Sequence, residues 1–215
     1  VKSQVQPNGF WVQYEYDDRG RIVKERQPSG DASPTAADSA CRVRTFSYEP
    51  VDENDDGEVF TFSPRTVETT VLGQVIGKQY RAIYKNTGGS WAYIKEQCTD
   101  LDAEYGDESN LKTTMAFAPN DENAGAGRLT FMVTPDELTA TLSYEYGTLS
   151  TNADASAWSF TAGTGEDMRT TITYGTGSNP QGIPNKTTRT FFVENQSGHM
   201  RMAEEMVRTE TDFER

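Results

Sequence analysis

The best candidate for metal binding in this chain is one short acidic segment. Residues 52–58 read Asp-Glu-Asn-Asp-Asp-Gly-Glu. In this run Asp52, Asn54 and Asp56 alternate and precede Gly57. That is the opening pattern of a calcium loop, in which alternate oxygens converge on one ion and a glycine permits the sharp bend. The chemistry it offers is weak calcium binding.

The second half of that calcium pattern is missing. A complete loop of the EF-hand type ends on a bidentate glutamate, and Ser63 stands at that position. The sequence also predicts no helices on either side of the run. An acidic, solvated turn is therefore the interpretation we favour, with calcium at Asp52, Asn54 and Asp56 as the alternative. We expect no other cofactor.

Groups for acid–base or nucleophilic catalysis are scarce. His199 is the only histidine. It follows Gly198 in an expected hairpin turn, and a general base needs a positioned partner, so we interpret it as an exposed turn residue. The sequence has no Gly-x-Ser-x-Gly elbow, no Cys/His metal set and no glycine-rich phosphate loop after a strand. We expect that the protein is not an enzyme.

Cys41 and Cys98 are the only thiols. One disulfide between them would suit an exported protein. Lone cysteines that lie far apart in sequence are at least as often two buried free thiols. Both alternatives stay open on the sequence.

Tryptophan side chains are the candidate ligand-binding groups. Trp91 and Trp158 could present flat aromatic surfaces to sugars. Aromatic residues at alternate strand positions are also what a hairpin needs for packing. We favour packing, with a glycan as the alternative partner.

The overall composition excludes some partners. The chain has 215 residues and a net charge of −13, which repels phosphate backbones and anionic lipid, so we expect no nucleic-acid partner. No stretch approaches about 18 consecutive apolar residues, so we expect no membrane insertion. With 34% apolar residues and 18 glycines, short strands and turns are favoured over helices.

The elements that position these residues are predicted to be β-hairpins. Residues 12–16 alternate between apolar or aromatic and polar types, the pattern of a half-buried strand. Asp17 and Gly20 bound a four-residue turn, in which the Asp carboxylate can accept backbone N–H bonds and the glycine can take a positive φ. Arg21 then begins a return strand, which ends at Pro28-Ser29-Gly30.

Parts of this hairpin recur later in the chain. The sequence Gly127-Arg128-Leu129 matches Gly20-Arg21-Ile22, and residues 139–147 repeat the Tyr-Glu-Tyr strand ending. A degenerate last unit has an Asx-x-x-Gly turn from Asn195 to Gly198. Further strand candidates are residues 42–49, 67–72, 74–76, 78–84, 90–95, 111–117, 127–133 and 169–174. Residues 202–208 carry the best helix signal, with Met202 and Met206 at i and i+4, but we favour a strand there because the segment follows a hairpin turn.

The first hairpin closely resembles the tyrosine–aspartate (YD) repeat of RHS-type proteins. The motif residues that carry the resemblance are Tyr14, Tyr16, Asp17, Gly20 and Arg21, then Gly127, Arg128, Tyr144 and Tyr146, then Asn195 and Gly198. The resemblance implies an interior segment of a large secreted or cell-surface protein of the bacterial envelope. In that family, hairpins join side by side into a shell that encloses a toxin or other cargo. The implied partners are the rest of the parent chain or its cargo.

We therefore predict an all-β fold of antiparallel hairpin repeats that form a curved or partly spiralled sheet, with little or no helix. Residues 1–215 would form a single repeat region, with candidate sub-units 1–50, 51–110, 111–150 and 151–215. The side chains expected to pack the wall of the sheet are Tyr14, Tyr16, Ile22, Phe46, Tyr48, Leu129, Phe131, Leu142, Tyr144, Tyr146 and Phe192. The predicted function is a non-catalytic scaffold. The alternative is an adhesion module that binds carbohydrate or protein through exposed aromatic side chains.

Overall fold

A computed structural model describes residues 2–58, 60–85, 88–119, 126–151, 158–175, 186–196 and 199–210, with the backbone alone at 151, 158, 186–196 and 199–210. The first strands are β1 (Lys2–Val5), β2 (Trp11–Tyr16), β3 (Ile22–Pro28), β4 (Cys41–Ser47), β5 (Thr66–Val71), β6 (Gln74–Lys85) and β7 (Trp91–Gln97). They are followed by β8 (Leu111–Phe117), β9 (Leu129–Val133), β10 (Thr139–Thr151), β11 (Trp158–Ala162), β12 (Asp167–Gly175), β13 (Lys186–Gln196) and β14 (His199–Glu210).

The fold is all-β, as the sequence predicts. Neighbouring strands pair antiparallel and follow one another in chain order, except that β11 and β12 both pair with β10. The only helical element of the described residues is a single 3₁₀ turn, Asp38–Ala40. The expected strand at residues 202–208 is confirmed, since it lies within β14. The short strands β1 and β11 were not predicted.

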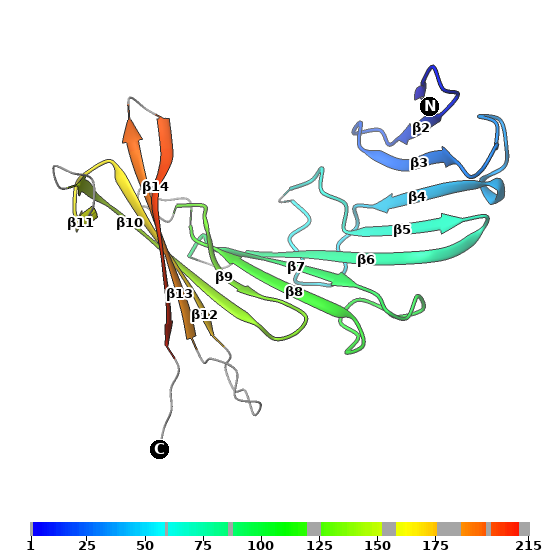
Figure 1. Cartoon of the computed structure of the whole chain (residues 1–215). Helices are drawn as coiled ribbons and strands as arrows, with labels where there is room; N and C mark the ends of the chain where they lie inside the picture. The colour runs from blue at the N-terminus through cyan, green and yellow to red at the C-terminus, as the bar shows by residue number, and fades with distance from the viewer. Residues whose placement is uncertain are drawn as a thin grey trace. The chain divides into compact units, whose positions relative to one another are not determined.

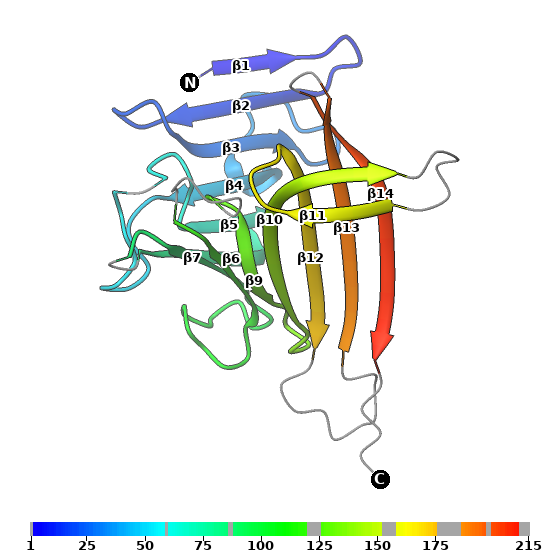
Figure 2. The ribbon, with the colours of Figure 1, turned by 90° about the vertical axis from the view of Figure 1, so that its left-hand side faces the viewer.

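The chain divides into two compact units. Unit 1 comprises Val1–Tyr84 and Tyr93–Thr113, and unit 2 comprises Lys85–Ala92 and Thr114–Arg215. In unit 1, the strands β2, β3, β4 and β5 lie side by side, blue to cyan in Figure 1. In unit 2, the long strands β10, β12, β13 and β14 lie side by side, yellow-green to red in Figure 2.

Unit 1 buries the side of β2 that carries Trp11. Trp11 is 2% exposed and packs with Cys41 and Val43 of β4, and Ala32 and Ala36 cover this cluster. The indole N–H of Trp11 donates to the carbonyl of Ala32 at 2.8 Å. The segment 29–40 therefore closes over one face of the first hairpin.

Two of the expected wall residues are exposed. Tyr16 in unit 1 is 37% exposed, and Tyr146 in unit 2 is 39% exposed. Tyr14 is half-buried. The alternation along β2 predicted its two faces correctly. The covering segment lies over the face of Trp11, however, so it does not bury the tyrosines on the other face.

Ion pairs hold the covering segment on β3. Asp38 pairs with Arg26, with 2.7 Å between Oδ1 and Nε, and its other oxygen contacts the ammonium of Lys24. Arg26 also donates to the carbonyl of Ala36. These contacts explain why a loop with few apolar side chains stays over Trp11.

Both cysteines are buried free thiols, which answers the question that the sequence left open. Cys41 belongs to the Trp11 cluster. Burial raises the pKa of the Cys98 thiol, although the ammonium of Lys78 opposes that shift. Both thiols act as small apolar groups in unit 1.

In unit 2, strand β10 changes partner at Gly147. This residue pairs with Ala162 of β11 and also with Asp167 of β12. A Cβ on Gly165 would overlap the carbonyl of Gly147, and a Cβ on Gly147 would overlap the carbonyl of Thr161. Glycine is therefore required at both positions for the two backbones to approach.

Two residues of the last predicted turn lie in a strand instead. Asn195 and Gln196 belong to β13, and they pair with Met200 and His199 of β14. The predicted turn residue Gly198 lies outside the described residues, as does residue 197. His199 is consequently the first residue of β14 and not a turn residue. Strand pairing continues further than the Asx-x-x-Gly pattern predicts.

Candidate functional site

The YD-like motif forms the turn between β2 and β3. The N–H of Asp17 donates to the carbonyl of Arg21 at 2.9 Å, and the N–H of Gly20 donates to the carbonyl of Asp17 at 3.0 Å. The Asp17 carboxylate accepts the N–H groups of Arg19 and Arg21, each at 2.9 Å. Gly20 has a φ of +78°. The Asp and the Gly therefore perform the turn roles that their positions predict.

Arg21 joins this turn to two other segments of unit 1. Its Nε lies 2.6 Å from Asp17 Oδ2, and its Nη1 donates to the carbonyl of Thr61 at 3.2 Å. Its guanidinium carbon lies 4.2 Å from the ring centre of Tyr48, just beyond β4. The hydroxyl of Tyr48 donates to the carbonyl of Ile22 at 2.9 Å. We call this pair of interactions the Arg–Tyr contact.

These contacts shift the pKa values of Asp17 and Tyr48. Partial desolvation raises the pKa of Asp17, but the backbone and side-chain bonds from Arg21 outweigh it, so the pKa lies below its usual value. Burial raises the pKa of Tyr48, and the charge of Arg21 opposes that shift. Asp17 is held ionised and Tyr48 is held neutral, which are the states that the contacts require.

The same contact recurs in unit 2. Arg128 lies 5.3 Å from the ring centre of Tyr144, and the hydroxyl of Tyr144 donates to the carbonyl of Leu129 at 2.7 Å. Gly127, directly before Arg128, has a φ of +63°. The arrangement of glycine, arginine and aliphatic residue against a tyrosine in or directly after the next strand is thus present twice.

The strand pairing around the two contacts also matches. In unit 1 a β-bulge between Glu15 and Tyr16 precedes the pair of Tyr16 with Ile22. In unit 2 a bulge between Ala116 and Phe117 precedes the pair of Phe117 with Leu129. The two units therefore contain the same structural repeat. Sequence reasoning missed the tyrosines as partners of the arginines, although Tyr-Glu at 48–49 and 144–145 was a usable signal.

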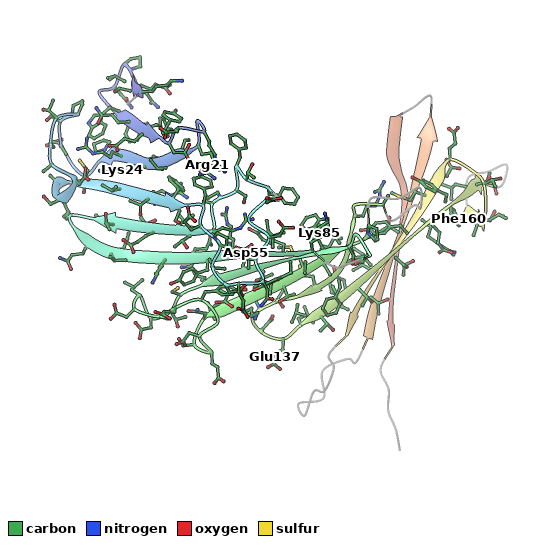
Figure 3. The ribbon with its side chains drawn as sticks, turned by 180° about the vertical axis from the view of Figure 1, so that it is seen from behind. Arg21, Lys24, Asp55, Lys85, Glu137 and Phe160 are labelled. Atoms are coloured by element: carbon green, nitrogen blue, oxygen red, sulfur yellow. The ribbon has the colours of Figure 1, made fainter. Side chains whose placement is uncertain are left out.

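The acidic segment contains a buried ion pair that the sequence did not reveal. Arg65 Nε lies 3.0 Å from both carboxylate oxygens of Asp55, and the exposed fractions of the two residues are 1% and 6%. Asp55 also accepts the N–H of Ile83 at 2.9 Å and that of Val51 at 3.2 Å. Figure 3 labels Asp55, which lies within unit 1. Together these donors compensate the buried negative charge of Asp55 and hold the loop in place.

Arg65 completes the anchoring of that loop. It donates to the carbonyl of Ser63 at 3.0 Å and to the carbonyl of Asp56 at 2.7 Å. The loop from residue 51 to residue 64 is therefore tied at several points to one buried guanidinium.

Two of the three candidate calcium residues, Asp52 and Asp56, accept hydrogen bonds within the protein. Asp52 Oδ1 accepts the N–H groups of Asn54 at 2.8 Å and Asp55 at 2.9 Å, and its Oδ2 accepts the hydroxyl of Tyr84 at 2.5 Å. Asp56 Oδ1 accepts the N–H of Glu58 at 3.0 Å. Within the described part of the chain, no group of three or more His, Cys, Asp or Glu residues is placed to hold a metal ion.

A tyrosine pair links this loop to the loop after β7. The hydroxyls of Tyr84 and Tyr105 lie 2.7 Å apart. Burial, followed by the bond to Asp52, raises the pKa of Tyr84 well above its usual value. Burial raises the pKa of Tyr105 to about 12. Both phenols therefore stay protonated and can keep their hydrogen bonds.

The candidate sugar-binding tryptophans Trp91 and Trp158 lie at the starts of β7 and β11. Trp91 stacks on Phe117, with ring centres 3.9 Å apart and an angle of 5° between the planes. One face of its ring is therefore covered by the protein. Trp158 begins β11 and pairs with Thr151, and its side chain lies outside the described residues.

A surface hollow of about 350 Å³ lies beside the first turn. Its lining includes Asp17, Asp18, Arg19, Arg21, Tyr48 and Glu49. Asp17 and Arg21 pair with each other, whereas Asp18, Arg19 and Glu49 are exposed. Charged side chains of both signs around an open hollow suit the binding of a charged group of a partner.

No protein-family model and no curated protein matches this chain. None of the helical structure in the described residues has the length and apolar character needed to cross a membrane.

Proposed function

We propose that this chain is a non-catalytic scaffold segment of a large secreted or cell-surface RHS/YD-repeat protein of the bacterial envelope. It contributes β-hairpins to a wall that encloses cargo. Its partners are the rest of the parent chain and that cargo.

The observation that carries this proposal is the repeated Arg–Tyr contact. The contact occurs at Arg21 with Tyr48 and at Arg128 with Tyr144, each time beside a bulge that ends a hairpin. A single hairpin is marginally stable in water, so repeated hairpins must share their edges with neighbours. A contact that ties the start of one strand to the next strand serves that purpose.

The test is electron microscopy of the full-length protein that contains this segment, together with its sequence on both sides. We expect further hairpin repeats and a hollow particle whose wall includes residues 2–210. A compact parent protein without additional hairpins would contradict the proposal.

A further inference from the structure

Two exposed phenylalanines lie close to the hollow beside the first turn. Phe60 is 51% exposed and Phe62 is 70% exposed. Thr61, which lies between them, accepts the hydrogen bond from Arg21, and Arg21 also lines the hollow. An apolar patch and a charged hollow therefore adjoin each other on unit 1.

The turn that carries the two phenylalanines is held in place. The N–H of Ser63 donates to the carbonyl of Phe60 at 2.7 Å, and Arg65 holds the carbonyl of Ser63. Phe60 has a φ of +50°, which is unfavourable for a residue with a Cβ. A rigid turn that displays aromatic side chains to solvent loses little conformational entropy on binding, and aromatic residues are common anchors of interfaces.

The charge around this patch selects the partner. The hollow is lined by three carboxylates and two guanidiniums, and Arg21 is already paired with Asp17. Glu53 and Glu58 add exposed negative charge on the same loop, and the whole chain carries −13. Such a surface attracts cations and repels a second copy of this acidic chain.

We propose that this surface, formed by the hollow together with Phe60 and Phe62, binds a protein segment with a basic side chain next to an apolar one. The Lys or Arg enters the hollow, where Asp18 and Glu49 face it. The neighbouring apolar side chain packs on Phe60 and Phe62. This inference is independent of the scaffold proposal, since it concerns one local surface of unit 1.

The test uses the whole chain and an array of immobilised peptides. Two adjacent central positions take every pair of amino acids between Gly-Ser flanks. We expect the strongest signals from pairs that combine Lys or Arg with a large apolar residue, and a decrease of these signals as salt is added. An array without that preference, or one that favours acidic pairs, would overturn the proposal.

Variants then localise the binding with the best peptide of the array. Phe62→Ser is expected to weaken binding by about tenfold, which corresponds to the loss of one anchoring side chain. Asp18→Asn and Glu49→Gln should each weaken it by about two- to fivefold. Ile76→Ser is the matched control, because Ile76 is 57% exposed on β6, and it should leave the affinity unchanged.

A gain of affinity separates this proposal from simple loss of folding. Arg19 is exposed at the hollow, so Arg19→Glu should tighten binding of the basic peptide by about threefold. Weaker binding by this variant, or equal effects of Phe62→Ser and Ile76→Ser, would overturn the proposal. Binding to a sugar on a glycan array that depends on Phe62 would also overturn it. Self-association of the chain through Phe62 would do the same.

Discussion

The two Arg–Tyr contacts have the same core and different surroundings. In unit 1, Arg21 also pairs with Asp17 and donates to Thr61, and it lies 4.2 Å from its tyrosine ring. In unit 2, the sequence between Phe117 and Gly127 is longer than that between Tyr16 and Gly20, and Arg128 lies 5.3 Å from its ring. In both units the tyrosine hydroxyl donates a hydrogen bond to the carbonyl of the aliphatic residue that follows the arginine. The register of the repeat is thus kept by the contact between strands, while the turn can vary.

The largest expected effect is local to unit 1. Asp55→Asn leaves the guanidinium of Arg65 buried without its counter-charge, so we expect about 3–5 kcal/mol of destabilisation. Urea unfolding measures the change, and hydrogen exchange should show loss of protection near Arg21 with protection near Arg128 retained. Asp18→Asn, on the surface, is the control. Restoration of stability by Asp55→Leu with Arg65→Met would confirm that the lone charge causes the loss.

The arginines should differ when each is replaced. Arg128→Met removes a cation–π contact, for which we expect a loss of about 0.5–1 kcal/mol. Arg21→Met removes such a contact, the ion pair with Asp17 and the hydrogen bond to Thr61, so we expect it to cost about 1 kcal/mol more than Arg128→Met. Equal losses in urea unfolding would show that the additional partners of Arg21 contribute nothing.

The tyrosine hydroxyls should behave alike. Tyr48→Phe and Tyr144→Phe each remove one hydrogen bond to a strand carbonyl and keep the ring, so we expect about 1 kcal/mol of destabilisation from each. Thermal unfolding of the two variants provides the comparison. A loss confined to Tyr48→Phe would mean that the contact of unit 2 does not stabilise its strands.

Two turns, one in each unit, have the same hydrogen-bond pattern but hold different residues at one position. The turn Thr134–Leu138 has the hydrogen bonds of the turn Asp17–Arg21, but Glu137, with a φ of +62°, stands where the first turn has Gly20 (Figure 3). A side chain is disfavoured in this conformation and glycine is not. Glu137→Gly should therefore stabilise the protein by about 0.5–1 kcal/mol, measured by urea unfolding. Gly20→Ala should have the opposite effect.

The smallest expected effect depends on pH. The pKa of Asp17 is lower in the folded protein than in the unfolded chain, so its ionised form stabilises the fold above the unfolded pKa of about 4. That contribution is lost as the pH falls through the lower, folded value. We expect Asp17→Asn to lower the thermal midpoint at neutral pH, and we expect the difference from the unsubstituted protein to shrink as the pH falls below about 4. A constant difference at all pH values would contradict this assignment.

Local patterns in the sequence predicted the hairpins and their turns, because alternation and turn residues act over a few positions. Asp17 and Gly20 could be assigned for that reason. Asp55 paired with Arg65 could not be predicted, since Asp55 was read as one of several solvated acids. The covering of Trp11 by segment 29–40 was missed for a similar reason: its contacts come from charged side chains of β3, and no periodic pattern indicates them. Tyr48 lies a whole strand away from Arg21, and only strand pairing brings the two together.

The change of partner at Gly147 has a consequence for how this protein tolerates variation in length. Because β12 takes its alignment from residues 139–147 of β10 and β11 takes its own from residues 147–151, the two alignments are set separately. Extra residues placed between β10 and β11 would shift only the short strand, and the long strands β12 to β14 would keep their partners. The pair Gly147 and Gly165 thus acts as a boundary that confines insertions to one end of unit 2.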